Sequence, residues 1–205
     1  MITGRNVASL SSRFAHGISE VLSPFILVAV LIAWVGYVSN PRWLFAAAIP
    51  IVFVSVIPFC IALVMTRSGK VTDKFVQQRK QRHLYYAISL GSLLAGLVLV
   101  LLIPASTELR WITVLAVVTL LLVMVINTKL KISIHALIGA LAAYVFLFGQ
   151  NERTLAALAV IAWLLVSWSR VYLHRHTLLE VICGSLFGAG VGAFFLWVAA
   201  ALPLP

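Results

Sequence analysis

The chain has 205 residues, of which 63% are hydrophobic and only 10% are charged, and its formal net charge is +10. Soluble domains carry about 25% charged residues, so this composition excludes an ordinary water-soluble globule and indicates an integral membrane protein. Backbone groups must be paired within lipid, and the long apolar runs lack the alternation of barrel strands. We therefore expect an all-α, polytopic membrane helix bundle that forms a single domain over residues 1–205.

The predicted elements begin with an interfacial amphipathic helix within residues 1–21, where apolar residues recur every three or four positions. We expect this helix to serve as an anchor or docking edge rather than as part of the catalytic site. Seven apolar runs of spanning length follow, which predicts about six to seven transmembrane helices. The candidate spans are residues 22–38, 43–66, 84–104, 110–127, 133–149, 154–172 and 178–201.

A stripe of glycines marks the last candidate span, where Gly184, Gly188 and Gly192 recur every four residues. Small residues at this spacing let helix backbones approach closely. Packing within the bundle is the favoured interpretation, and a homo-oligomer interface is the alternative.

The basic residues are distributed unequally between the two sides of the predicted bundle. Seven spans place 12 of the 15 Lys and Arg residues on the side of the N-terminus, and only Arg42, Arg110 and Arg153 on the other. Cytoplasmic loops are enriched in Lys and Arg, so this basic side is predicted to be cytoplasmic. The net charge is thereby explained without nucleic acid, and we expect a multi-pass cell-membrane protein, as in a bacterial inner membrane.

Three polar segments, at residues 73–83, 129–135 and 169–180, all fall on this basic side. Arginine suits phosphate because its guanidinium donates two parallel hydrogen bonds. His176 and Glu180 are four residues apart, so the carboxylate can orient the imidazole and leave its other nitrogen to attack phosphorus. His135 can protonate the departing alkoxide. Covalent phosphoryl transfer is thus predicted without a metal or another cofactor.

The third segment reads S-R-x5-H-x3-E and resembles the S-R-x5-H-x3-D signature of the type-2 phosphatidic acid phosphatase superfamily. Those enzymes are helical membrane phosphatases related to vanadium haloperoxidases. The resemblance covers about residues 67–200 and makes the first two spans look like additions to the core. It implies that His176 becomes phosphohistidine, that Glu180 orients it and that Arg170 binds the phosphate.

The other two segments resemble the family's motifs only in part. Ser133 and His135 match the family's P-S-G-H, which implies phosphate binding and general acid catalysis. The first segment departs most from K-x6-R-P, since taking Arg82 as its arginine places Phe75 at the lysine position. We expect phosphate binding by a further set of cations: Arg79 and Arg82, assisted by Lys74 or Lys131.

The expected function is hydrolysis of a lipid phosphate, of the phosphatidate, phosphatidylglycerol phosphate or polyprenyl phosphate or diphosphate type. One alternative is a phosphotransferase that uses His176, and another is a non-catalytic protein that binds or transports lipid phosphates. A zinc site is a third, formed by His174, His176, Glu180 and His135. It ranks lower because Arg170 and Arg175 would lie beside the metal ion and oppose its charge.

Overall fold

The computed structural model describes residues 10–76, 78–149 and 152–202, without the side chains of residues 79 and 80. Within this part of the chain all regular structure is helical, which confirms the predicted all-α class. The helices are α1 (Leu10–Val21), α2 (Pro24–Ser39), α3 (Trp43–Ile51), the π-helical turn η1 (Val52–Val56), α4 (Ile57–Arg67), α5 (Arg79–Leu102), α6 (Thr107–Ile126), α7 (Ile134–Gly149), α8 (Arg153–Tyr172) and α9 (Leu178–Ala201).

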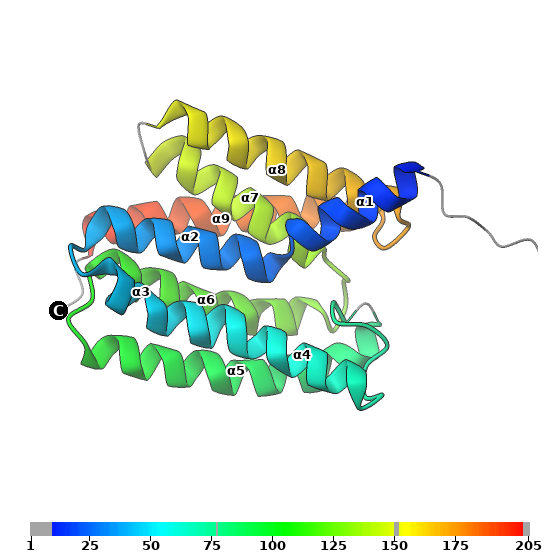
Figure 1. Cartoon of the computed structure of the whole chain (residues 1–205), viewed down its shortest axis with the longest axis horizontal. Helices are drawn as coiled ribbons and strands as arrows, with labels where there is room; N and C mark the ends of the chain where they lie inside the picture. Colours follow the sequence, from blue (N-terminus) through cyan, green and yellow to red (C-terminus); the bar gives the residue numbers. More distant parts are fainter. Residues whose placement is uncertain (1–9, 77, 150–151, 203–205) are drawn as a thin grey trace, which may run out of the picture.

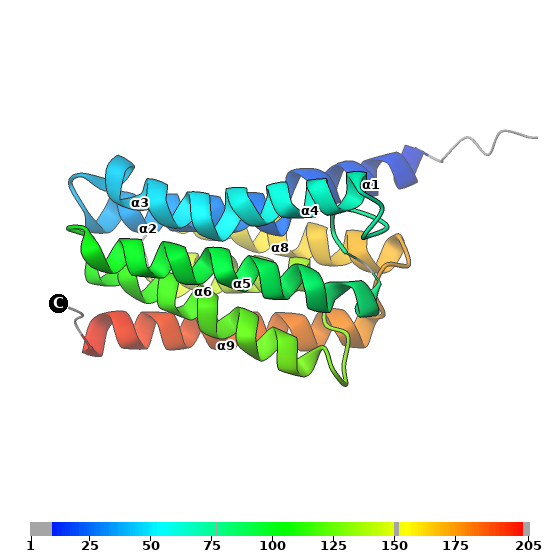
Figure 2. The same ribbon diagram turned by 90° about the horizontal axis from the view of Figure 1, so that it is seen from below.

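The long helices lie side by side in one bundle (Figures 1 and 2). Within the described residues, five segments are long and apolar enough to cross a membrane, and the α1–α2 pair, bent by 41°, would make a sixth. The shorter α7 is also apolar. Only 22–33% of each long span is buried inside the protein, so most of its apolar surface faces outward. This arrangement is compatible with a multi-pass membrane protein.

The second candidate span is continuous through α3, η1 and α4, although it contains Pro50 and Pro58. Proline lacks an N–H and its ring clashes with the carbonyl four residues earlier. The π-helical turn η1 includes Val54, four residues before Pro58, where this clash would otherwise fall. The carbonyl of Phe53 in this turn accepts a hydrogen bond of 2.7 Å from Ser92 Oγ, which ties the span to α5.

The glycine stripe of α9 packs directly against α7. A Cβ at Gly184 would lie 2.6 Å from the carbonyl oxygen of Ser133, and one at Gly188 would overlap the carbonyl of Leu137. The prediction of packing within the bundle is confirmed, and this face is occupied by the chain's own α7. The close approach places the first turn of α7 beside the first turn of α9.

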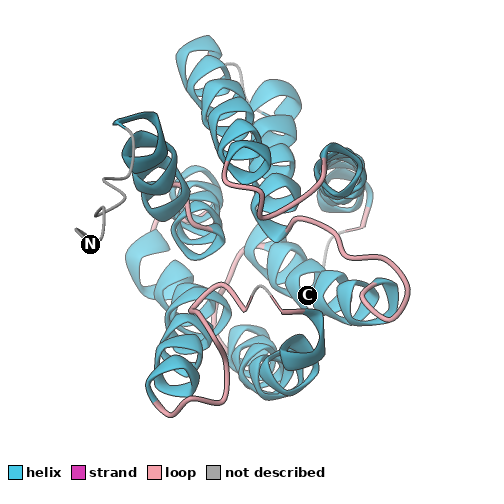
Figure 3. Ribbon diagram, turned by 90° about the vertical axis from the view of Figure 1, so that its right-hand side faces the viewer, coloured by secondary structure: helices cyan, strands magenta, loops and turns pink. Residues whose placement is uncertain are grey.

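The three predicted polar segments meet at one end of the bundle. The α4–α5, α6–α7 and α8–α9 connections lie there together with α1, and the C-terminus lies at the other end (Figures 1 and 2). Figure 3 views the bundle from this end. Hydrogen bonds join the segments, since Arg82 donates to the carbonyl of Ile132 at 3.5 Å and Lys131 donates to the carbonyl of Arg175 at 3.0 Å. The three segments, which were expected on one side of the bundle, therefore lie together at one end of it.

Candidate active site

The turn between α8 and α9 brings Arg170 and His176 together. His174 adopts the left-handed conformation, with φ 52°, directly after the last turn of α8. The amides of Arg175 and His176 then both donate to the carbonyl of Arg170, at 3.0 and 3.2 Å. The first of these bonds is the six-to-one bond of a Schellman motif. The five-residue interval between arginine and histidine is therefore the length of a helix-ending turn.

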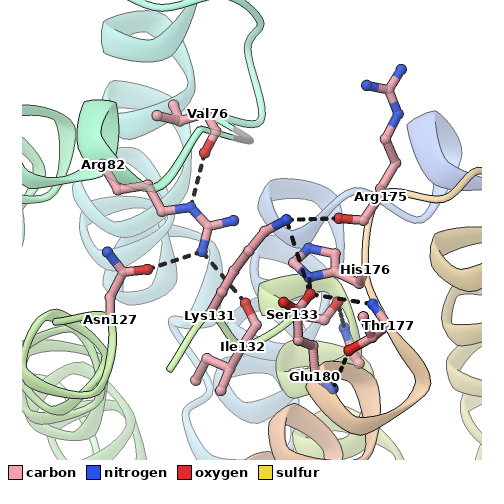
Figure 4. A network of polar contacts seen from close by, with 11 residues as sticks. Val76, Arg82, Asn127, Lys131, Ile132, Ser133, Arg175, His176, Thr177 and Glu180 are labelled. Carbon is pink, nitrogen blue, oxygen red and sulfur yellow. Dashed lines mark hydrogen bonds and ion pairs between the residues drawn. The ribbon is translucent and has the colours of Figure 1, made fainter. Parts of the chain in front are cut away.

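Glu180 holds His176 through a capping box at the start of α9 (Figure 4). The Glu180 amide donates to Thr177 Oγ1 at 3.2 Å, and Glu180 Oε2 accepts from the Thr177 amide at 3.3 Å. The same oxygen lies 2.7 Å from His176 Nδ1. A carboxylate can only accept, so Nδ1 carries the proton and Nε2 presents a lone pair. This arrangement suits a nucleophilic imidazole.

Cations surround this pair. Lys131 Nζ lies 3.9 Å from Glu180 Oε2. Burial, together with the charges of Arg170, Lys131 and Arg82, lowers the pKa of His176 far below its ordinary value. The histidine is therefore neutral, as a nucleophile must be. Burial also lowers the pKa of Lys131, and Glu180 opposes that shift.

Arg170 is almost fully buried at the end of α8. Its Nη1 donates to Ser19 Oγ of α1 at 2.7 Å, whereas its Nε has no hydrogen-bond partner among the described residues. A buried guanidinium nitrogen without a partner is costly. An anion placed beside Arg170 would satisfy that nitrogen.

His135 lies buried in the first turn of α7, on the other side of the same site. Its ring forms a hydrogen bond with the backbone of Ser19, while its Nε2 has no partner within the described part of the chain. The ring also packs edge to face on Phe75, with 4.8 Å between the ring centroids. The His135 ring is thus held in place by one nitrogen, and its other nitrogen is available to transfer a proton.

Arg82 joins two of the connections as well as contributing charge. Its Nε donates to the carbonyl of Val76 at 2.9 Å, and its Nη1 donates to Asn127 Oδ1 at 3.2 Å (Figure 4). These bonds fix the α4–α5 connection against the end of α6. Arg82 therefore shapes the site in addition to the phosphate-binding role predicted for it.

Two of the predicted phosphate ligands, Ser133 and Lys74, are paired with other groups of the protein, and the side chain of a third, Arg79, is not described. The Ser133 amide donates to the carbonyl of Glu180 at 3.1 Å, so this amide is already paired within the protein. Its hydroxyl oxygen accepts from the third following amide and caps α7. Lys74 forms a salt bridge with Glu20 of α1. The side chain of Arg79 lies outside the described residues.

Several residues at the site were not predicted from sequence. Thr177 could have been found, because Thr177-x-x-Glu180 before an apolar run is the capping-box pattern. Ser19 and Glu20 of α1 could not, because their contacts with Arg170 and Lys74 cross long stretches of sequence. The first helix thus contributes to the site and is more than the anchor or docking edge expected of it.

The set of ligands required by the zinc alternative is not assembled. Among the described residues, no three His, Cys, Asp or Glu side chains gather closely enough to hold a metal ion. His174 belongs to the left-handed turn after α8.

An apolar cavity of about 180 Å³ adjoins the site. It runs between α2, α5, α6 and α7, and His135 forms part of its wall. Phe25 and Leu31 of α2 line it, as does Val54 of η1. The first two spans therefore contribute to a cavity beside the site, although the sequence suggested that they were additions to the core.

The resemblance of residues 169–180 to a phosphatase signature rests on the residues and their spacing. No protein-family model, curated protein or solved structure matches this chain.

Proposed function

We propose that the protein is a membrane phosphatase that hydrolyses a lipid phosphate through a phosphohistidine at His176. One observation carries the proposal: a neutral, buried histidine is held by a carboxylate at 2.7 Å, amid the cations of Arg170, Lys131 and Arg82. The carboxylate supplies orientation, and the cations stabilise the charge of a phosphoryl group in transfer. Within residues 169–180, Arg170, His176 and Glu180 have the order and spacing of the phosphatase signature, with Glu180 in place of its aspartate.

In the first step, His176 Nε2 attacks phosphorus and the ester P–O bond breaks. The leaving oxygen takes a proton from His135, which enters the step protonated, a form that the negative phosphate favours. Glu180 offsets the positive charge that His176 gains. Water then attacks phosphorus and gives a proton to His135, the P–N bond breaks, and orthophosphate leaves.

The apolar cavity supports a substrate that carries a hydrocarbon chain. His135 lines this cavity, so a phosphate at His135 can have its chain in an apolar environment. The substrate class is the phosphomonoester or diphosphate of a lipid, as in phosphatidate, phosphatidylglycerol phosphate or a polyprenyl phosphate. The excess of Lys and Arg at this end of the bundle supports a site that opens toward the cytoplasm.

The test is phosphate release from a panel of these lipid phosphates by the purified protein in detergent. We expect turnover in the presence of EDTA, inhibition by vanadate, and a loss of about 10³-fold or more in His176→Ala. His83→Ala, an exposed histidine next to Arg82 on α5, is the matched control and should keep full activity.

Full activity in His176→Ala would rule out the phosphohistidine, and loss of activity in EDTA would indicate a metal-dependent reaction. Adding an acceptor alcohol distinguishes the phosphotransferase alternative, because a transferase would form a new phosphate ester in place of orthophosphate.

A further inference from the structure

Two cavities meet at the α4–α5 connection. The apolar cavity described above reaches Lys74 and Phe75 from the membrane side of the site. A second, polar pocket of about 150 Å³ lies between α1, this connection and the end of α8, and includes Arg170 in its wall. Lys74 and Phe75 line both cavities. The two residues thus form the partition between an apolar cavity and a polar pocket, which is lined by Arg170, Arg175 and Lys74 and also by Glu20 and Asp73.

The Phe75 ring lies between two groups that the proposed reaction needs together. On one side it packs edge to face on His135, with centroids 4.8 Å apart and an interplanar angle of 73°. The guanidinium carbon of Arg170, which lines the polar pocket, lies 5.9 Å from the same ring centroid. A phosphate that contacts both Arg170 and His135 must therefore pass this ring or move it.

The segment that carries Phe75 is held by contacts that can be exchanged. Lys74 pairs with Glu20 of α1, and the carbonyl of Val76 accepts from Arg82 Nε at 2.9 Å. Val76 itself has φ 45°, a left-handed conformation that is strained for a β-branched residue. A substrate phosphate would compete for Arg82 and Lys74, and a shift of the segment would relieve the strain at Val76.

We propose that Phe75 is a specificity-determining residue that restricts the site to phosphates borne on a hydrocarbon chain. A chain that enters the apolar cavity gains the burial energy needed to move the ring from between His135 and Arg170. A soluble phosphate has no such surface to bury and meets a closed partition. The inference rests on the proposed function for its substrate, whereas the contacts of Phe75 with His135 and Arg170 are independent of it.

The experiment compares wild type with two variants. Phe75→Ala removes the ring and opens the partition, and Phe75→Trp replaces it with a larger ring and closes the partition further. The first readout needs no catalysis: binding of orthovanadate, a soluble phosphate mimic, followed by ⁵¹V NMR without lipid. We expect roughly tenfold tighter binding in Phe75→Ala and weaker binding in Phe75→Trp. Phe25→Ala is the matched control, since it removes a ring of the same cavity that packs on Phe59, and it should leave vanadate affinity unchanged.

The second readout is the ratio of kcat/KM for dioleoyl over dihexanoyl phosphatidate. We expect this preference to fall by about tenfold in Phe75→Ala, because the short chain no longer has to displace the ring. Unchanged vanadate affinity in both Phe75 variants, or no vanadate binding to any of the proteins, would overturn the role of Phe75. If wild type hydrolyses no lipid phosphate, the proposed function fails, and vanadate binding alone still decides whether Phe75 closes the site.

Discussion

Glu180 occupies a position where the phosphatase signature has aspartate, and its contacts give a reason. The side chain reaches back to the Thr177 amide at 3.3 Å and also contacts His176 Nδ1 at 2.7 Å. In a capping box, the side chain of the third helical residue must reach back to the backbone amide of the N-cap residue, and the glutamate side chain is long enough to do so. The longer side chain thus caps α9 and contacts His176 with the same oxygen.

Replacing Glu180 with glutamine should lower kcat toward a lipid phosphate by about 10²–10⁴-fold. The amide of glutamine can donate to Nδ1, which would favour the tautomer whose Nε2 carries the proton and cannot attack. Steady-state kinetics on the purified variant measures the effect. Glu108→Gln, in the first turn of α6 at the other end of the bundle, is the control. Retention of wild-type kcat in Glu180→Gln would show that the carboxylate does not orient His176.

The lowered pKa of His176 predicts its charge state directly. A histidine of ordinary pKa, about 6.5, is mostly protonated at pH 5, whereas His176 should stay neutral from pH 7.5 to about 5. Below about pH 6.5 the unfolded chain binds a proton that the folded chain does not, so His176 makes stability fall as the pH is lowered.

Imidazole ¹⁵N chemical shifts of histidine-labelled protein test this charge state, with His176→Ala identifying the signal. A His176 signal that titrates near pH 6.5 would contradict the buried, cation-flanked environment.

For individual residues, the sequence predicts contacts between near neighbours in the chain and misses contacts between distant ones. His176 and Glu180 are four residues apart, so one helical turn determines their contact. The bond from Arg170 to Ser19 joins residues 151 positions apart, and no local pattern encodes it. Phe75 was recognised only as the residue at the family's lysine position, because its place between His135 and Arg170 depends on three separate elements.

Among the helices, the contact of α7 with α9 positions both halves of the site. The glycine stripe of α9 predicts that alanine substitutions at neighbouring glycines of this helix differ sharply in their effect on stability. Gly188→Ala would place a methyl group against the Leu137 carbonyl, and we expect it to destabilise the protein by about 1–3 kcal/mol. Gly190→Ala is the control on the same helix, because a Cβ there meets nothing within 4 Å.

Thermal unfolding in detergent compares the two variants. Equal midpoints for Gly188→Ala and Gly190→Ala would mean that α9 does not pack on α7 as closely as the structure has it.

Helix positions were predictable from hydropathy, but their ends and irregularities were not. The fifth candidate span, residues 133–149, matches α7 at Ile134–Gly149. By contrast, α5 begins at Arg79, several residues before the predicted span at 84, because the helix extends beyond its apolar part. The π-helical turn η1 was not anticipated, since a hydropathy window registers only that Pro50 and Pro58 lie in an apolar run.

For the molecule as a whole, the proposed cytoplasmic opening predicts opposite accessibility of the two ends of the bundle. In a background of Cys60→Ser and Cys183→Ser, we expect Lys70→Cys to react with a membrane-impermeant maleimide only after permeabilisation of the cells. Arg42→Cys, exposed at the other end, should react in intact cells. The physical reason is the retention of Lys- and Arg-rich loops in the cytoplasm. Labelling of Lys70→Cys in intact cells would reverse the proposed orientation.

The position of α1 has a practical consequence for handling the protein. Ser19 and Glu20 contact residues of the site, whereas α9 ends at the far end of the bundle (Figure 1). We expect a purification tag or fluorescent fusion joined ahead of α1 to disturb the contacts of this helix with Arg170 and Lys74 more than one joined behind α9. Assays of turnover should therefore use fusions at the C-terminal end, and an N-terminal fusion offers a way to perturb the site without changing any of its residues.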